Sequence, residues 1–305
     1  MTRVSVNGRE LEISHPDKPI FPDEKITKKE LVEYYLRISE RILPYLEERP
    51  VMLHRYPDGI GGKDFYQKEK PDYFPEWIDT IQVKVKKEGK ETQELVHCNS
   101  AATLAYVANQ ASITPHVWLS RRDRIDHPDR MIYDLDPPED DFTVVREAAK
   151  DLKNLFDELD LKSYLMTTGS KGLHVLVPLD GSADFDRVRK FARQAAGLLA
   201  GRRSDAYTVE TRKEKRKGRL FLDYLRNSYG QTAVAPYALR AREGAPVATP
   251  LDWDELSNRD LDSRRYTYRN IFRRLGSKQD PWKDLSEARN SLGEAEEKLD
   301  KKTGR

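Results

Sequence analysis

The chain has 305 residues, 35% of them charged and 37% hydrophobic, which is long enough for one large domain or two small ones. Its 54 Lys and Arg residues nearly balance 52 Asp and Glu residues, for a net charge of +2, so overall charge neither requires nor excludes a nucleic-acid partner. The single cysteine, Cys98, excludes an intramolecular disulfide and fits a reducing cytosol, and no run approaches the roughly 20 apolar residues of a membrane helix.

The first third of the chain predicts two hairpins, two helices and a strand. Asn7-Gly8 is a turn signal between two alternating runs, and Thr27 with Glu30 three residues later is a capping box that begins a helix. A charged turn around Gly89 predicts a protruding hairpin. The predicted elements are a hairpin over 4–13, a helix beginning at Thr27, a strand over 51–56, a hairpin over 81–96 and a helix over 101–110.

The central part predicts the order strand, helix, hairpin, helix, strand. The ranges are a strand over 132–135, a helix over 142–159, strands over 164–168 and 174–179, a helix over 185–200 and a strand over 219–224. This order is typical of an α+β sheet with helices packed on one side, close to an RRM-like layout. Beyond Pro281 the charged sequence predicts a surface helix that frays towards Lys301–Arg305.

The most informative run extends from Met131 to Pro138, where apolar residues lead into two aspartates and two prolines. Asp134 and Asp136 are two residues apart, so on a strand both side chains point to one face. Such close like charges repel unless a cation lies between them, and Mg²⁺ binds carboxylate oxygens while leaving positions for phosphate. The pair therefore predicts a metal site, and the alternative is an exposed acidic loop.

Asp223 is a third candidate, because it is the single charge in an apolar, strand-like run from Leu220 to Tyr224. A carboxylate there is costly unless it is paired or binds a metal, although alternation also allows a side chain that faces water. With Asp134 and Asp136 it would hold two Mg²⁺ or Mn²⁺ ions, as nucleotidyl transfer requires. One ion would activate a 3′-hydroxyl and the other would bridge a triphosphate.

A glycine-rich segment from Thr167 to His174 is a candidate phosphate-binding turn. Its glycines let backbone N–H groups approach phosphate, and its hydroxyls and Lys171 add donors and charge. The spacing differs from that of a P-loop and a strand follows, so an ordinary turn is the alternative. His174 would be either a phosphate-facing imidazole or an ordinary core histidine.

Two arginines, Arg240 and Arg242, end the segment that begins at Gln231. On an extended segment residues i and i+2 share a face, which would suit the β- and γ-phosphates of a nucleotide. The alternative is a solvated basic edge.

These runs occur together in an order that resembles the polymerase domain of prokaryotic ligase D. That family acts in non-homologous end joining and belongs to the archaeo-eukaryotic primase superfamily. The motifs that carry the resemblance span nearly the whole chain: HPDK at 15–18, GIGG at 59–62, FYQK at 65–68, DLDP at 134–137, TGSKGLH at 168–174, FLDY at 221–224 and QTAVAPY at 231–237. The resemblance implies a primase-like catalytic fold with an RRM-like mixed or antiparallel sheet and flanking helices.

By this resemblance, Asp134, Asp136 and Asp223 match the catalytic, metal-binding aspartates. His116 falls near the incoming sugar, where a polar group can contact a 2′-hydroxyl; alone it would pass as a loop histidine. The full implied set of nucleotide-binding residues is His116, Thr168, Ser170, Lys171, His174 and Arg240.

The resemblance also implies DNA contacts. Lys18 and Lys28 would grip a 5′-phosphate, and Phe65 with Tyr66 would form an aromatic platform for a template base. The alternatives are solvated lysines and core rings. Arg216 would lie near the active-site mouth, in a basic cluster that attracts phosphate backbone in any reading. Residues 84–93 fit a hairpin that helps to bring two DNA ends together.

The implied function is a DNA-end-joining repair polymerase that fills gaps and adds a few terminal nucleotides, preferring ribonucleotides, with Mn²⁺ or Mg²⁺ and NTP or dNTP substrates. One alternative is a primase catalytic subunit that starts chains de novo, although a single cysteine leaves no zinc knuckle. The other is an RRM-like nucleic-acid-binding module without chemistry. Asp134→Ala would leave binding by such a module intact.

The implied partners are DNA with gaps or broken ends bearing a 5′-phosphate, a Ku-like protein, a DNA ligase and a second copy in a transient dimer across a DNA synapse. No membrane partner is expected, and the location would be the cytoplasm, at the nucleoid. We expect one domain over 1–305, with a DNA-facing lobe over 1–115, a catalytic lobe over 116–280 and a charged tail over 281–305. No Lys-x-Asp-Gly ligase motif is present, and the Met1 start and family-like end favour a stand-alone polymerase.

Overall fold

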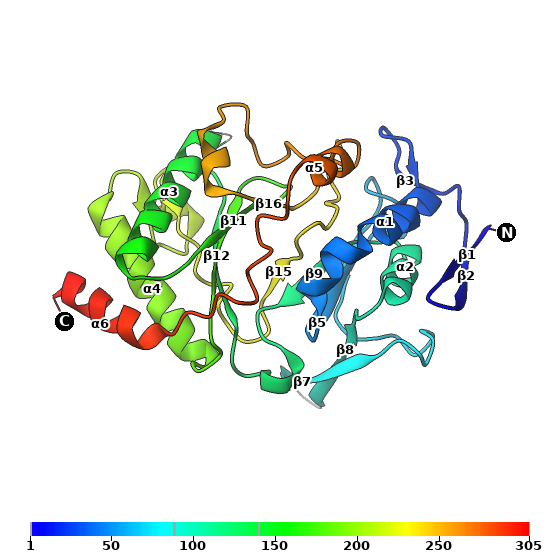
Figure 1. Ribbon diagram of the computed structural model, residues 1–305, viewed down its shortest axis with the longest axis horizontal. Coiled ribbons are helices and arrows are strands. Elements are labelled where there is room, and N and C mark those ends of the chain that lie inside the picture. The colour runs from blue at the N-terminus through cyan, green and yellow to red at the C-terminus, as the bar shows by residue number, and fades with distance from the viewer. Residues whose placement is uncertain (1, 88–89, 140, 305) are drawn as a thin grey trace. The chain divides into compact units, whose positions relative to one another are not determined.

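The computed structural model describes residues 2–87, 90–139 and 141–304, which form two compact units (Figure 1). Unit 1 comprises Met1–Ile125, Thr232–Ala248 and Thr267–Ile271, and unit 2 comprises Asp126–Gln231, Thr249–Tyr266 and Phe272–Arg305. The sequence predicts single boundaries after residues 115 and 280. The chain instead returns to unit 1 twice, and one cause is a late strand that pairs with a much earlier one.

Unit 1 begins with the expected hairpin and a capped helix. Its first elements are β1 (Thr2–Val6), β2 (Arg9–Ile13), β3 (Pro19–Phe21), β4 (Ile26–Thr27) and α1 (Lys28–Leu46). The capping box is formed: the Thr27 N–H donates to Glu30 Oε2 at 2.6 Å, and the Glu30 N–H donates to Thr27 Oγ1 at 3.4 Å. The predicted start of α1 is therefore confirmed.

The main sheet of unit 1 has the order β15-β9-β5-β8-β7, with β6 also paired to β5, and its pairs are antiparallel. Its strands are β5 (Pro50–Arg55), β6 (Phe65–Gln67), β7 (Thr80–Lys87), β8 (Lys90–His97), β9 (Ser112–Trp118) and β15 (Thr232–Val234). Helix α2 (Ala101–Asn109) packs against α1 and β9. The predicted turn at Gly89 lies outside the described residues. The sequence analysis missed β9, because its side chains are almost all buried and do not alternate.

Unit 2 is built on an antiparallel sheet with the order β10-β12-β11-β16. The strands are β10 (Arg130–Leu135), β11 (Tyr164–Thr167), β12 (Leu173–Pro178) and β16 (Thr249–Leu251), and the helices are α3 (Phe142–Glu158) and α4 (Phe185–Arg202). An isolated bridge between Asp134 and Asp223 continues the sheet beyond β10. The resulting order, with the Asp223 segment next to β10, β12 and β11, is that of a split βαβ sheet. The α+β prediction is confirmed.

The two faces of β10 differ sharply. Met131, Tyr133 and Leu135 point into a hydrophobic core shared with α3 and α4, and the Tyr133 hydroxyl donates to the carbonyl of Ala192 in α4 at 2.8 Å. Figure 1 shows both helices beside β11 and β12. Because side chains alternate along a strand, Asp134 points to the opposite face. The helices therefore cover one face of the sheet and leave the aspartates on the other.

The predicted strand over 219–224 and the predicted helical tail have different outcomes in the structure. The strand over 219–224 is reduced to β14 (Leu220–Phe221), which pairs in parallel with β13 (Tyr207–Thr208). After α5 (Ile271–Ser277), the tail forms the predicted helix, α6 (Leu292–Thr303), which packs on α4 and buries Leu292, Ala295 and Leu299; fraying of its last residues stays a prediction. Three single-turn 3₁₀ helices lie at Arg122–Arg124, Lys213–Lys215 and Trp253–Ser257.

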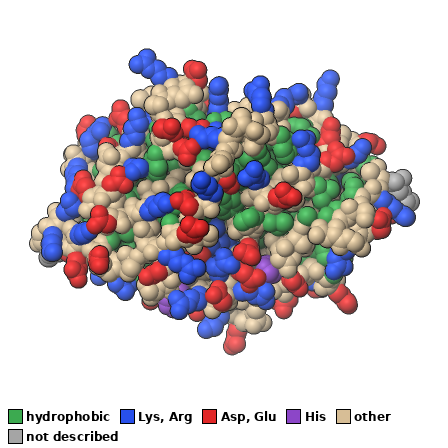
Figure 2. Space-filling model, in the orientation of Figure 1, with side chains coloured by type: hydrophobic (Ala, Val, Ile, Leu, Met, Phe, Trp, Pro, Cys, Tyr) green, Lys and Arg blue, Asp and Glu red, His purple; other side chains and the backbone are tan. Residues whose placement is uncertain are grey.

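The surface reflects the balanced charge of the sequence. Basic and acidic side chains are interspersed over the face shown in Figure 2. Among the described residues, no helix combines the length and the apolar character needed to cross a bilayer.

Candidate active site

The three candidate aspartates lie along one edge of the unit 2 sheet. The Asp134 N–H donates to the Asp223 carbonyl at 3.1 Å, so the two residues face each other across an antiparallel bridge. Residues opposed in this way carry their side chains on the same face, with Cβ atoms about 4.5–5.5 Å apart. Asp136 follows Asp134 by two residues and is the more exposed of the two. The structure therefore brings the three carboxylates together on the face that α3 and α4 leave uncovered.

The Asp134 carboxylate lies between a histidine ring and an arginine guanidinium. His174, directly opposite on β12, places Nε2 3.4 Å from Asp134 Oδ1, and Arg226 places Nη2 3.3 Å from Oδ2. Burial by itself raises the pKa of Asp134, but the charges and hydrogen bonds of His174 and Arg226 outweigh burial and lower this pKa. Asp134 is therefore held ionised.

The other two carboxylates have raised pKa values. Burial, and then the negative charge of Asp134, raise the pKa of Asp136 to about 6. Burial also raises the pKa of Asp223, and its hydrogen bond from the Leu225 N–H at 2.8 Å only partly offsets this. The cluster is thus short of positive charge, as expected for carboxylates whose natural neighbour is a cation.

Within the described residues, no three His, Cys, Asp or Glu side chains are already arranged to hold one metal ion. The contacts explain why: His174 and Arg226 engage both oxygens of Asp134, and Asp223 Oδ1 accepts a backbone hydrogen bond. The donor set nevertheless fits a hard divalent cation, because three carboxylates share one face. Binding an ion would require rotation of these side chains.

Two residues that fix this edge were missed by sequence reasoning, namely Arg226 and Asn227. The Asn227 side chain is fully buried, accepts from the Ile132 N–H at 2.8 Å and donates to the Ile132 carbonyl at 2.8 Å. It thereby ties the segment after Asp223 to β10. The sequence around Asn227, Arg-Asn-Ser, matches no motif. It therefore gives no indication that the partner of Asn227 lies 95 residues away.

The glycine-rich turn is stabilised from within by Thr168. Its hydroxyl accepts from the N–H groups of Ser170 at 3.3 Å and Gly172 at 3.2 Å, and donates to the Gly172 carbonyl at 3.1 Å. One donor and two acceptor sites are thus used inside the turn. A phosphate contact by Thr168 stays a prediction, and two of the backbone N–H groups of the turn already donate to its hydroxyl. Lys171 and the Ser170 hydroxyl remain as candidate phosphate contacts.

The outside of the same turn is fixed by a later segment of unit 2. The Ser170 carbonyl accepts from the Ser263 hydroxyl and from Arg264 Nε, both at 2.9 Å. At Gly172 a Cβ atom would lie 1.8 Å from the Leu135 carbonyl oxygen and 2.9 Å from Asp136 Oδ1. Only glycine allows the turn to approach the aspartates so closely.

His174 lies between the turn and the aspartates. It is 4% exposed, and its Nδ1 has no hydrogen-bond partner among the described residues. A buried ring nitrogen without a partner costs free energy unless a ligand satisfies it. This arrangement favours a ligand-facing histidine over an ordinary core histidine.

The predicted nucleotide-binding residues of unit 1 are His116 and Arg240. His116 lies on β9, opposite Met52 of β5 and Val234 of β15. The segment around Arg240 is not extended as expected: the Arg242 N–H donates to the Arg240 carbonyl at 2.8 Å, which closes a tight three-residue turn. Arg240 and Arg242 therefore do not share a face through strand alternation.

Phe65 and Tyr66 do not form one platform. They are neighbours on β6, so their rings lie on opposite faces of the strand. Tyr66 stacks on His54 with ring centroids 4.0 Å apart, and His54 Nε2 lies 2.5 Å from Asp64 Oδ2. Phe65 pairs instead with Arg55, whose guanidinium carbon is 5.3 Å from the ring centroid. Both rings are exposed, so the alternative that they belong to the core is wrong.

The two predicted phosphate-binding lysines lie close together in unit 1. The Lys28 N–H donates to the Lys18 carbonyl at 2.8 Å, Lys28 Nζ donates to Ser14 Oγ at 2.7 Å, and Lys18 Nζ pairs with Asp58 at 2.8 Å. Burial, and then the charge of Lys18, lower the pKa of Lys28. Two adjacent cations of this kind favour binding of an anion.

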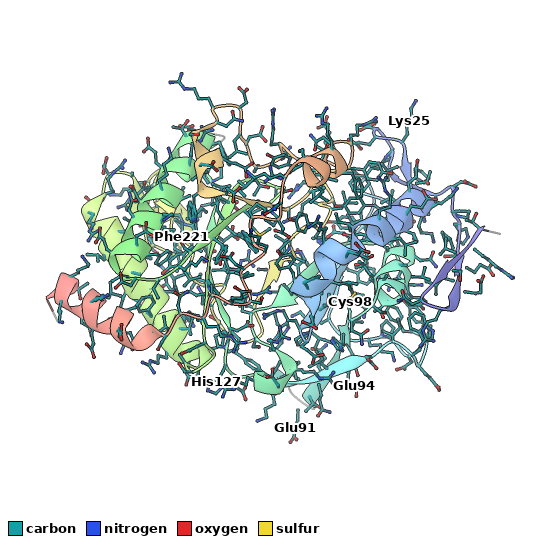
Figure 3. The ribbon with its side chains drawn as sticks, viewed as in Figure 1. Lys25, Glu91, Glu94, Cys98, His127 and Phe221 are labelled. Atoms are coloured by element: carbon teal, nitrogen blue, oxygen red, sulfur yellow. The ribbon has the colours of Figure 1, made fainter. Side chains whose placement is uncertain are left out.

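Arg216 of unit 2 is used to hold its own loop. Its guanidinium donates to the carbonyls of Glu210 at 3.0 Å and Thr211 at 2.9 Å and lies 4.2 Å from the ring centroid of Phe221, which is labelled in Figure 3. Its positive charge also acts on Asp223. A DNA contact by Arg216 stays a prediction, as does a synaptic role for the β7–β8 hairpin, part of which lies outside the described residues.

Comparison with known proteins decides the family. The family model described as LigD, primase-polymerase domain, matches residues 27–282. The chain belongs to the LigD primase-polymerase domain family. It is therefore a nucleotidyltransferase of the polymerase type, and its primase-like fold is confirmed by a TM-score of 0.84 to the polymerase domain of Mycobacterium tuberculosis ligase D in complex with DNA. That similarity covers 92% of this chain and 99% of the other, at 28% identity.

The curated relatives are longer proteins that are named for non-homologous end joining. The multifunctional non-homologous end joining protein LigD of Pseudomonas aeruginosa is 35% identical over 93% of this chain, and the bifunctional LigD of Bacillus subtilis is 32% identical over 90%. The chain spans 34% and 44% of the length of these two relatives. The similarity therefore concerns the LigD polymerase domain, and the remaining activities of those proteins lie outside it.

Proposed function

We propose that the chain is a DNA-end-joining repair polymerase that extends a 3′-hydroxyl at a short gap or broken end. The observation that carries this proposal is the placement of Asp134, Asp136 and Asp223 on one face of the unit 2 sheet, beside the glycine-rich turn, in a member of the LigD polymerase family. Template-directed gap filling would be the main reaction, with limited terminal addition where no template remains.

The three aspartates would hold two Mg²⁺ or Mn²⁺ ions. The raised pKa values of Asp136 and Asp223 support this assignment, because a cation would relieve the repulsion between the carboxylates. When bound, the ions would favour the ionised 3′-hydroxyl and offset charge on the leaving pyrophosphate. Arg226, which contacts Asp134, would keep that carboxylate ionised and oriented in the free enzyme.

The nucleoside triphosphate would bind through the turn and its neighbour. Lys171 and the Ser170 hydroxyl would contact the phosphates from the turn, and the buried Nδ1 of His174 would complete the site. His116 would contact the ribose, and a 2′-hydroxyl contact there would favour ribonucleotides. Arg240, a residue of unit 1, would contact the phosphates of the nucleotide.

The DNA would carry a 5′-phosphate, bound by Lys18 and Lys28. The lowered pKa of Lys28 supports this, because an incoming phosphate would restore a favourable environment for its charge. A Ku-like protein, a DNA ligase and a second copy across a synapse are the proposed partners. Because its substrate would be DNA, the protein would act in the cytoplasm, at the nucleoid.

The test is an extension assay on a one-nucleotide gap, with and without a 5′-phosphate, with Mn²⁺ and either NTP or dNTP. We expect incorporation that Asp223→Asn lowers by about 100-fold or more while DNA affinity is kept, because only the metal site changes. Lys28→Ala should reduce the preference for the 5′-phosphate.

Two results would contradict the proposal. If the protein copies unprimed single strands as efficiently as it fills gaps, it is a primase. If Asp223→Asn extends like the wild type, the assigned catalytic centre is wrong.

A further inference from the structure

Exposed aromatic rings are concentrated in one short part of unit 1. Among the described residues, the large hydrophobic side chains that remain exposed are Phe65 at 43%, Tyr66 at 52% and Tyr73 at 62%. Single exposed apolar side chains are common and need no explanation, but neighbouring ones mark a binding surface. Phe65 and Tyr66 were predicted to bind DNA, whereas Tyr73 has no assigned role.

Arg55 connects Phe65 to Tyr73. Its guanidinium carbon lies 5.3 Å from the Phe65 ring centroid, and its Nη1 donates to the Tyr73 hydroxyl at 2.6 Å. The guanidinium is itself fixed, because Arg55 is only 9% exposed and its Nε donates to the Gln110 carbonyl at 2.9 Å. Tyr73 is thus anchored at its hydroxyl while most of its ring surface remains open to solvent.

The rings on the two sides of β6 form separate surfaces. Tyr66, stacked on His54, lies on the face that also carries His116, whose ring centroid is 5.9 Å away. Phe65 lies with Arg55 on the other face. A single base cannot stack on both faces of a strand at once, so a base bound to Tyr66 would leave the Phe65 side open to a second one.

We propose that Phe65, Arg55 and Tyr73 form a second stacking surface that binds an unpaired base of single-stranded DNA. Aromatic rings beside a guanidinium suit nucleobases of any sequence, since every base has a π-face and the strand is anionic. A related pattern continues along the unit, where Phe74 packs edge-on against Tyr73 and Arg9 lies 4.7 Å from the ring of Trp77. The rings are held in place before binding, which limits the loss of conformational entropy.

This inference rests on the proposed function and adds a requirement to it. A template strand that crosses the edge at β6 would place one unpaired base on Tyr66 and a different one on the surface of Phe65, Arg55 and Tyr73. Two unpaired template nucleotides are therefore needed to occupy both surfaces. A fully filled one-nucleotide gap would not occupy the second one.

The experiment measures affinity by fluorescence anisotropy for recessed duplexes with none to four unpaired template nucleotides. We expect the wild type to gain affinity with the first and again with a later unpaired base. Tyr73→Ala should lose the second gain, by about 5- to 150-fold in affinity. Tyr73→Phe keeps the ring and should retain most of the gain, so it is the matched control.

An abasic nucleotide in the overhang isolates the contact. In the wild type it should cost as much as Tyr73→Ala does on the intact strand, and the two changes together should cost no more than either alone. Additive losses, or equal binding by the wild type and Tyr73→Ala, would overturn the inference.

An overhang that brings no second gain to the wild type would overturn it as well. The proposed function is judged separately, by extension at the one-nucleotide gap. Tyr73 is exposed, and circular dichroism of both variants checks that their fold is kept.

Discussion

Asp134, Asp136 and Asp223 share one face of a sheet but differ in electrostatic environment. Asp134 has His174 and Arg226 as neighbours, and its pKa is lowered. The structure shows no such ion pair for the Asp136 side chain among the described residues. Burial and the nearby charge of Asp134 raise its pKa to about 6. In the metal-free protein at neutral pH, the ionised Asp136 carboxylate is therefore destabilising.

This imbalance predicts a metal-dependent stability. Mn²⁺ should raise the melting temperature of the wild type, because an ion that binds only the folded state stabilises it by about 2.7 kcal/mol at 100 times its Kd. Asp136→Asn should be more stable than the metal-free wild type by up to about 1 kcal/mol, since one like charge is gone but solvent screens part of the repulsion at this exposed position. It should also respond much less to Mn²⁺.

Differential scanning calorimetry with and without Mn²⁺ measures both effects. Asp186→Asn, on the exposed start of α4, is a matched control and should respond to Mn²⁺ like the wild type. A wild type whose melting temperature ignores Mn²⁺ would argue against the assigned metal ligands.

A second residue-scale prediction concerns Asn227. Asn227→Ala removes both side-chain hydrogen bonds to Ile132 and leaves its buried N–H and carbonyl groups without those partners. Each lost partner costs about 1–3 kcal/mol, so the loss of two should lower the free energy of unfolding by about 2–6 kcal/mol. Urea unfolding measures this.

Asn227 acts through Asp223, because it ties the following segment to β10. The variant should therefore lose more in kcat than in the KM for DNA, at a temperature where it is folded. A proportional loss of activity and folded protein, with kcat per folded molecule unchanged, would show that Asn227 only supports the fold.

Neither Arg226 nor Asn227 was predictable from the sequence. Arg226 contacts Asp134 across 92 residues and Asn227 contacts Ile132 across 95. Such contacts depend on which segment lies beside β10, and no local pattern specifies that. Asp134, Asp136 and Asp223 were predictable because a charge in an apolar strand is unusual wherever the strand lies.

At the scale of elements, the sequence predicted those helices and hairpins that depend on interactions between residues close together in the chain. The Thr27–Glu30 capping box, the β11–β12 hairpin and the amphipathic α3 all formed near their expected positions. The run around Asp223 was harder, because it joins β10 only by one bridge. Strand β16, which completes the sheet, is three residues long and carries a proline, so its sequence gives almost no strand signal.

One element-scale prediction concerns the 3₁₀ helix at Trp253–Ser257 and its link to α5. Glu255 accepts from Arg274 Nη1 at 2.7 Å and from Lys278 Nζ at 2.9 Å, and its side chain is 16% exposed. Burial raises the pKa of Glu255, but these partners and the Asp252 N–H outweigh burial and lower the pKa to about 2. A lowered folded-state pKa means that this stabilisation is fully present above about pH 4.5 and is lost as pH falls towards 2.

Glu255→Gln should therefore lower the free energy of unfolding at pH 7 by about 2 kcal/mol. The difference from the wild type should shrink as pH falls from about 4.5 towards 2, because protonation removes the same charge from the wild type. Urea unfolding across this pH range measures the difference. Asp254→Asn, a neighbouring exposed position, is the control and should change stability by less than about 0.5 kcal/mol.

At the scale of the whole molecule, the chain passes between the two units at five points, after residues 125, 231, 248, 266 and 271. Neither unit is a continuous segment. Unit 1 needs β15, which pairs with β9 from far along the chain, and the sheet of unit 2 needs β16, which follows β15. Sequence alone could not place these exchanges, because β15 and β16 are each three residues long.

This connectivity predicts that the two units unfold together. Cys98 is a probe for unit 1: it is 1% exposed, burial raises the pKa of its thiol to about 12, and Figure 3 marks its place. A thiol reagent should therefore label it only when unit 1 opens. Hydrogen exchange of α4 peptides reports on unit 2 in the same urea series. We expect both transitions at the same urea concentration, because losing either unit frees the segments that the other requires.

A fragment ending at Ile125 should remain unfolded, since it lacks β15. Labelling of Cys98 at urea concentrations where α4 does not yet exchange would instead show that unit 1 unfolds while unit 2 stays folded.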